Sequence, residues 1–106
     1  MATLHGFFIN GGLAEYVRVE PSRLVPVPAG TDAATVGLVE PLAVVVHGIN
    51  RVPLISGMSA LVVGSGSIGL LTAAVLADRG INVDIVCRHP HQFEAAEKLG
   101  VNAVSK

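Results

Sequence analysis

The sequence predicts an α/β fold, and two observations in its second half predict it. First, a short apolar run at 61–63 (Leu-Val-Val) leads into the glycine pattern G-x-G-x-x-G at 64–69 and then into an apolar helical stretch. Second, the order strand, helix, strand, helix and start of a strand repeats along 58–106. Strands that alternate with helices form a parallel sheet, so we expect one here.

Length and composition indicate one ordinary globular domain. The 106 residues are 51% apolar and 14% charged, which is typical of a chain that folds around a core. A net charge of -1 and the small number of aromatic residues do not support nucleic-acid binding. A single cysteine excludes an internal disulfide, and no secretory or transit signal opens the chain, so we expect a cytoplasmic protein.

One uncharged stretch, 60–77, is nearly long enough to cross a membrane. It contains three glycines and two serines within six positions, and no basic cluster flanks it. Because the glycines divide the stretch into a strand and a helix, we expect no membrane association.

Residues 1–30 resemble the end of a β domain. Segment 13–20 is rich in β-branched and aromatic residues, and 24–28 predicts a short edge strand because its two prolines cannot donate to a ladder. Two strands alone are marginal in water, so we expect the rest of that domain to be missing.

Residues 31–57 predict connecting helices and a linker. Thr31 or Asp32 can cap a helix that begins at Ala33, and Pro41 would end or restart it. A second, strongly apolar helix is expected over 42–50, with His47 as a hydrogen-bonded core residue. Glu40 is conspicuous, because a carboxylate among apolar neighbours is costly to desolvate without a partner.

Residues 58–106 predict the first half of a Rossmann parallel sheet. The helix that begins at Ser67 is expected to end near Arg79 with Gly80 as its cap, and the second strand follows over 81–86. Pro90 is well placed to begin the next helix, which ends before Gly100. Right-handed crossovers put both helices on one face of the sheet, so the other face lacks its cover and we expect self-association.

Five segments, in this order and spacing, resemble the medium-chain dehydrogenase/reductase family, in particular its zinc-dependent alcohol, polyol and sugar dehydrogenases. They are 11–17 (Gly-Gly-Leu-Ala-Glu-Tyr-Val), 25–28 (Val-Pro-Val-Pro), 39–43 (Val-Glu-Pro-Leu-Ala), 62–70 (Val-Val-Gly-Ser-Gly-Ser-Ile-Gly-Leu) and 94–103 (Glu-Ala-Ala-Glu-Lys-Leu-Gly-Val-Asn-Ala). The resemblance implies the end of a GroES-like catalytic domain at 1–30, connecting helices at 31–57 and the N-terminal half of a Rossmann domain at 58–106. It also implies reversible oxidation of an alcohol, polyol or sugar by a nicotinamide cofactor.

The family's zinc ligands and later nicotinamide-binding strands do not lie in this sequence, so we expect the isolated chain to be incomplete and inactive. Glu40 matches an acidic residue that lies in or beside the catalytic zinc shell of the polyol and sugar branch. It can contribute to such a site only with Cys and His ligands that are absent here, and in this chain it is more readily explained as a cap for the helix at Pro41.

The glycine turn and the end of the second strand are the predicted cofactor site. The glycines permit a tight turn, close approach of the backbone to a pyrophosphate, and close packing of helix on strand. An NAD enzyme places Asp or Glu after the second strand to bind the ribose 2′-hydroxyl, whereas this chain has Cys87 followed by Arg88 there. We therefore expect NADP rather than NAD, with Asp84 as the competing candidate. The predicted cofactor-binding residues are Gly64, Ser65, Gly66, Ser67, Ile68, Gly69, Cys87, Arg88 and His89.

Two other functions stay open at this level. A zinc-free quinone-reductase-like enzyme would share the glycine turn, although the Glu40-Pro41 pair argues against it. The chain could also be a complete small protein that binds nucleotide or self-associates without catalysis. Cys87 as a small buried apolar residue is compatible with either cofactor.

Overall fold

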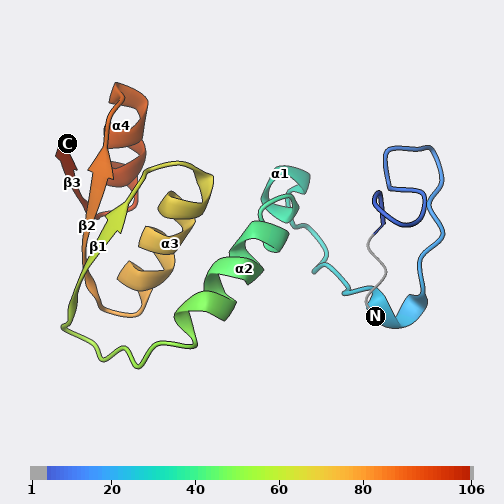
Figure 1. Ribbon diagram of the computed structural model, residues 1–106, viewed down its shortest axis with the longest axis horizontal. Helices are drawn as coiled ribbons and strands as arrows, with labels where there is room; N and C mark the ends of the chain where they lie inside the picture. The colour runs from blue at the N-terminus through green and yellow to red at the C-terminus, as the bar shows by residue number, and fades with distance from the viewer. Residues whose placement is uncertain (1–4, 106) are drawn as a thin grey trace. The chain divides into compact units, whose positions relative to one another are not determined.

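The computed structural model describes residues 5–105, which fall into two units that divide after Thr31. Each unit is described by itself, and Figure 1 shows the elements of both.

The described part of the first unit, residues 5–31, has almost no regular structure. It contains one 3-10 helix, η1 (Pro21–Arg23), and an isolated bridge between His5 and Ile9. The strands predicted over 13–20 and 24–28 are wrong: the structure has no strand in either segment. A strand needs a partner for its backbone groups, and none of the described residues supplies one to these segments.

The second unit begins with two helices, α1 (Ala33–Val36) and α2 (Val39–Ile49). The predicted cap is confirmed, since the Asp32 carboxylate accepts the Thr35 N–H at 3.2 Å. The predicted start of the second helix at residue 42 is wrong by three residues. Pro41 lies inside the first turn of α2, where backbone N–H groups have no intrahelical partner, so its missing N–H costs nothing.

The sheet has three parallel strands in the order β1-β2-β3: β1 (Ser59–Val63), β2 (Asn82–Cys87) and β3 (Asn102–Ser105). Two helices connect them, α3 (Ser67–Asp78) and α4 (Pro90–Lys98). In register, Val62 lies opposite Ile85 and Ile85 opposite Ala103. Figure 1 shows α3 and α4 on the same face of the sheet, as right-handed crossovers require. The predicted α/β fold with a parallel Rossmann-type sheet is confirmed.

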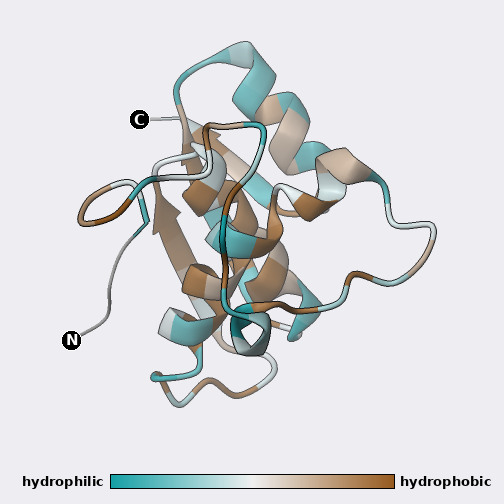
Figure 2. Cartoon of the chain, turned by 90° about the vertical axis from the view of Figure 1, so that its right-hand side faces the viewer, coloured by the Kyte–Doolittle hydropathy of each residue, from teal (hydrophilic) through white to brown (hydrophobic). Residues whose placement is uncertain are grey.

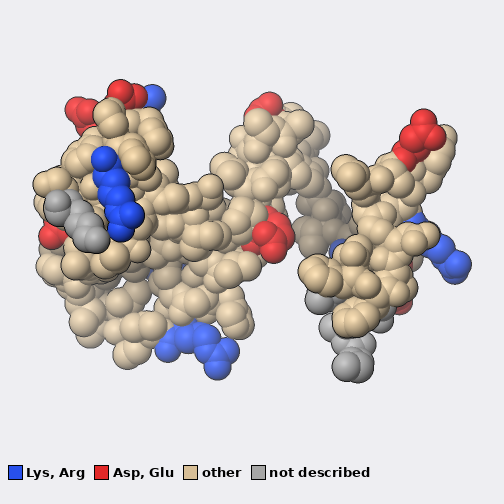
Figure 3. Space-filling view, turned by 45° about the horizontal axis from the view of Figure 1, so that its top comes forward, with Lys and Arg blue, Asp and Glu red and all other residues tan. Residues whose placement is uncertain are grey.

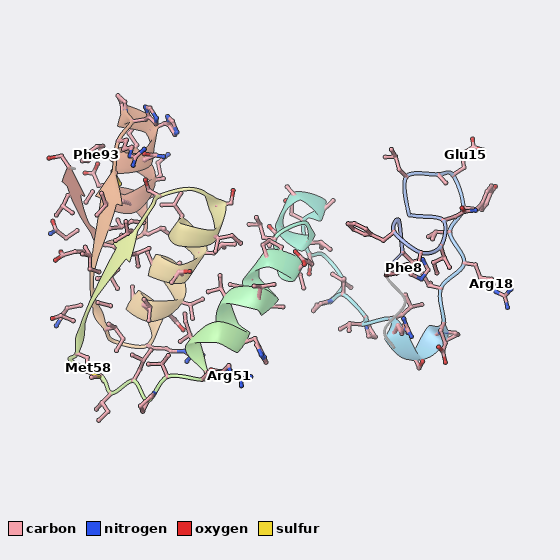
Figure 4. All side chains as sticks on the ribbon, viewed as in Figure 1. Phe8, Glu15, Arg18, Arg51, Met58 and Phe93 are labelled. Carbon is pink, nitrogen blue, oxygen red and sulfur yellow. The ribbon has the colours of Figure 1, made fainter. Side chains whose placement is uncertain are left out.

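The core lies between this face of the sheet and the helices. Ile85 and Cys87 of β2 are completely buried there, against Ala73 of α3 and Ala96 of α4. Phe93 of α4 packs on the edge of this cluster (Figure 4). The strands and the inner side of α3 form the brown, apolar part of Figure 2, whereas much of α4 is hydrophilic.

Helix α2 extends the core by packing on α3 through Val45 and Ile49, which are both buried. The ends of the two helices are joined by a 2.7 Å hydrogen bond that Arg79 Nη2 donates to Asn50 Oδ1. Gly80 then turns the chain into β2 with a φ of 74°. These contacts fix α3, and with it the turn that leads into α3.

The other face of the sheet is open and carries both apolar and polar side chains. The side chains of Leu61 and Val63 on β1 are 62% and 80% exposed. On β2 and β3 the pair Asp84 and Asn102 lies in register, and Asn102 Nδ2 donates to Asp84 Oδ1 at 2.6 Å. None of the described helices is long and apolar enough to cross a membrane.

A glycine-lined cavity as candidate functional site

The turn between β1 and α3 has a geometry that two of its glycines make possible. Gly64 follows the last residue of β1 with a φ of 108°, a conformation that a side chain would strain. At Gly69 a Cβ atom would overlap the Gly64 carbonyl group. The first turn of α3 therefore lies directly against the end of β1, and any side chain at position 69 would separate them.

Gly66 is different, because nothing in the fold requires a glycine there. Its φ of -80° is open to any residue, and a Cβ atom added to it would meet no atom within 4 Å. Gly66 is the N-cap of α3 and supplies no side-chain cap, so the first N–H groups of the helix face open space. Such N–H groups, at the positive end of a helix dipole, favour an anion.

An open cavity of about 590 Å³ lies above this turn. It brings together five of the predicted site residues with four that sequence reasoning missed. The predicted ones are Gly64, Ser65, Gly66, Arg88 and His89; the missed ones are Val63, Val86, Gln92 and Ser105.

The cavity lies at the carboxyl edge of the sheet because the strands are parallel. Val63, Cys87 and Ser105 end β1, β2 and β3, so the segments that follow them meet at one edge of the sheet. In open α/β sheets, ligands bind outside this carboxyl edge. The glycine turn and the residues that follow β2 therefore line the same cavity.

Four of the predicted residues do not line the cavity. Ser67, Ile68 and Gly69 form the first turn of α3 beneath it. Cys87 is 1% exposed, and its side chain lies on the core face of β2 with Ile85. The thiol is a small buried apolar group, and Arg88 is the first residue after β2 that reaches the cavity.

Gln92 organises the loop that presents Arg88 and His89. Its Oε1 accepts the Arg88 N–H at 2.8 Å and the His89 N–H at 3.1 Å. Gln92 is the third residue of α4, behind Pro90 in the first position, which is the pattern of a capping box. That spacing was the signal in the sequence that could have identified Gln92.

The charge in the cavity is positive. Arg88 is exposed, and no described carboxylate lies within ion-pair distance of its guanidinium. None of the described residues that line the cavity is Asp or Glu. Asp84 lies in the middle of β2, bonded to Asn102, and lines a different cavity with Gly80 and Gly100. On the face that Figure 3 presents, the charged groups lie in small clusters, and in one of them acidic and basic groups are side by side.

Glu40 is exposed in the first turn of α2. Within residues 5–105, no three His, Cys, Asp or Glu side chains come together in a way that could hold a metal ion. The described residues therefore do not form a zinc site. His47 is not a core residue as predicted: it is exposed, and its Nε2 lies 3.4 Å from the Nη1 of Arg51, which follows α2 (Figure 4).

With this geometry established, similarity to known proteins decides the family. The chain is 40% identical over 94 residues to (R,R)-butanediol dehydrogenase of Saccharomyces cerevisiae, a match that covers 88% of this chain and 25% of the relative. It is 32% identical over 102 residues to an uncharacterized zinc-type alcohol dehydrogenase-like protein of Haemophilus influenzae. That match covers 93% of this chain and 29% of the relative. The chain belongs to the medium-chain dehydrogenase/reductase family. It spans about a quarter of the length of these relatives.

Structural similarity agrees with the fold of this medium-chain dehydrogenase/reductase chain. The crystal structure of galactitol-1-phosphate dehydrogenase from Escherichia coli superposes with a TM-score of 0.78 at 21% identity, covering 92% of this chain and 29% of that one. Residues 60–106 also match the family described as Ketopantoate reductase PanE/ApbA. That second match lies entirely within the segment that contains the glycine turn, and it covers less than half of the chain.

Proposed function

We propose that this chain is the part of an NAD(P)-dependent, zinc-type dehydrogenase that holds the adenosine diphosphate half of the cofactor. The whole enzyme would oxidise an alcohol, polyol or sugar reversibly. The observation that carries the proposal is the cavity in which the glycine turn and Arg88 meet at the carboxyl edge of a parallel sheet. The names of the relatives, which include a butanediol dehydrogenase, support the substrate class.

The residues present fit a nucleotide diphosphate. The open space above Gly66 gives the backbone room to approach a pyrophosphate, and the free N–H groups of Ser67 and Ile68 can donate to it. Gly64 and Gly69 keep the turn tight against the strand. The nicotinamide group supplies the hydride chemistry when it is bound. This chain's own contribution is to bind the cofactor and to orient it.

The adenosine ribose would be recognised at the end of β2. Arg88 can pair with a 2′-phosphate, and His89 beside it can add a donor. An enzyme selective for NAD places a carboxylate here, and the described residues that line this cavity include none. These features favour NADP over NAD.

Two parts of the proposal concern the larger enzyme. We propose the end of a GroES-like domain at 1–30, connecting helices at 31–57 and the half Rossmann domain at 58–106. Glu40 would reach a catalytic zinc only together with Cys and His ligands that the described residues do not supply. A cytoplasmic location and self-association through the open sheet face stay predictions.

The test is calorimetric titration of the purified chain with NADP⁺ and with NAD⁺, beside the variant Arg88→Ala. We expect binding of both, tighter for NADP⁺, and a loss of about ten- to hundredfold in NADP⁺ affinity on removing Arg88, the size of one charge-assisted hydrogen bond. An equal loss for both cofactors would remove the 2′-phosphate assignment. Absence of binding by the wild-type chain would overturn the proposal.

A non-catalytic nucleotide-binding protein is the second candidate. It would use the same glycine turn and the same cavity. A hydride-transfer assay with a panel of alcohols and sugars, run on the 106-residue chain and on a longer relative, separates the two. Turnover only by the longer protein supports an incomplete enzyme, and turnover by this chain alone would contradict it.

A further inference from the structure

Gln92 shares the cavity with Arg88 and the glycine turn, yet the function proposed above gives it no role. In the first turn of α4, Gln92 makes three hydrogen bonds to the backbone of Arg88 and His89. Its Oε1 accepts hydrogen bonds from the N–H groups of Arg88 and His89, at 2.8 and 3.1 Å. Its own N–H donates to the His89 carbonyl at 2.9 Å. The backbone from which the Arg88 side chain extends is therefore fixed by Gln92.

These bonds also decide which way the Gln92 amide faces. Two N–H donors point at one end of it, and only the oxygen can accept them. The NH₂ group is thus at the other end. No hydrogen bond of this nitrogen is found among the residues that the structure describes, and no buried side-chain nitrogen lacks a partner there, so the NH₂ group is accessible to solvent. Gln92, half-buried at the cavity, therefore has an accessible donor group that can bind a ligand.

We propose that Gln92 is a specificity-determining residue for a nucleotide with a phosphate monoester on its adenosine ribose. Its oxygen positions the Arg88–His89 loop, and its NH₂ group donates to the phosphate. The inference rests on the proposed function and narrows it to 2′-phosphorylated cofactors. A phosphate monoester has three acceptor oxygens and is largely dianionic at neutral pH. Arg88 supplies the opposite charge, Gln92 supplies a neutral donor, and no carboxylate in the cavity opposes them.

Two small probes isolate this part of the site: 2′,5′-ADP, which has the ribose phosphate, and 5′-ADP, which lacks it. Gln92→Glu keeps an oxygen for both backbone N–H groups but replaces the NH₂ donor with a negatively charged oxygen. Gln92→Met removes acceptor and donor without adding charge. The matched control is Lys98→Gln, which changes the net charge by the same amount as Gln92→Glu at the far end of α4.

Calorimetric titration gives the ratio of the two affinities for each variant, and thermal unfolding confirms that each variant folds. We expect Gln92→Glu to lower the affinity for 2′,5′-ADP by about tenfold or more relative to 5′-ADP, the effect of losing a hydrogen bond to a charged group. Gln92→Met should change the ratio in the same direction, and Lys98→Gln should leave it unchanged.

The outcomes separate this inference from the function on which it rests. If Gln92 is only a helix cap, it affects the ratio only through Arg88, so Gln92→Met added to Arg88→Ala leaves the ratio as in Arg88→Ala alone. That result overturns the inference while the proposed function stands. A further loss of affinity for 2′,5′-ADP in the double variant supports direct donation by the NH₂ group. A wild-type chain that binds 5′-ADP without preferring 2′,5′-ADP also overturns it. A wild-type chain that binds neither probe overturns both proposals.

Discussion

The two units of this chain contain similar apolar side chains but differ in what those side chains contact. In residues 5–31 none is buried, and the side chains of Leu13 and Tyr16 are almost fully exposed. In the unit from residue 32 onward, Ile85 and Ala73 are completely buried. Apolar, β-branched sequence is therefore not sufficient for a strand. It forms one only where neighbouring strands and a covering helix are encoded in the same segment.

The largest difference between the two units is expected when one apolar side chain in each is truncated. Ile85→Ala removes a buried side chain from the centre of the sheet, and we expect it to lower the free energy of unfolding by about 2–5 kcal/mol. Leu13→Ala, in the exposed unit, should change it by less than about 0.5 kcal/mol. Urea unfolding followed by circular dichroism measures both, and equal effects would contradict the assignment of the core.

A second test compares glycines. Gly69→Ala forces a methyl group against the Gly64 carbonyl, and we expect a loss of about 1–3 kcal/mol of stability. Gly12→Ala in the first unit meets no neighbouring atom and should be nearly neutral. The same urea titrations report both changes. A stable Gly69→Ala variant would mean that α3 does not lie this close to the end of β1.

The cap of α1 offers a smaller effect, at the start of the second unit. Asp32→Ala removes the acceptor of the Thr35 N–H, and we expect a loss of about 1 kcal/mol. Asp32→Asn keeps an oxygen in the same place and is the matched control. If thermal unfolding shows equal losses for the two variants, the hydrogen bond is not the cause.

The smallest effect on stability is expected at Gly66, where the effect on binding should be large. Aspartate is a favoured N-cap, so Gly66→Asp should change stability by only a few tenths of a kcal/mol. Its carboxylate would occupy the N–H groups proposed for the diphosphate and repel that anion. We therefore expect nucleotide binding to be lost in calorimetry while the unfolding midpoint stays unchanged. Retained binding would exclude the turn as the diphosphate site.

The sequence was most informative where local chemistry determines structure. The glycine turn, the cap at Asp32 and the helix start at Pro90 could be predicted because each depends on residues a few positions apart. The strands predicted at 13–20 and 24–28 are wrong because a strand depends on partner strands elsewhere in the chain. The residue pattern within a segment does not show whether such partners exist.

The same distinction applies to the candidate site. Arg88 could be placed at the cavity because it follows the end of the predicted second strand, and the spacing of Gln92 behind Pro90 was a further signal in the sequence. Ser105 is brought there by the parallel register of β3 on β2, which no local pattern shows. Side chains alternate between the two faces of β2, and Cys87 is the last residue of this strand. Cys87 therefore lies on the same core face as Ile85.

Amide chemical shifts show whether the glycine turn binds a nucleotide diphosphate. In a titration of the ¹⁵N-labelled chain with NADP⁺, we expect the largest shifts at residues 64–69, with a second group at 88–92. Shifts confined to other residues, or none at saturating NADP⁺, would exclude the glycine turn as the binding site.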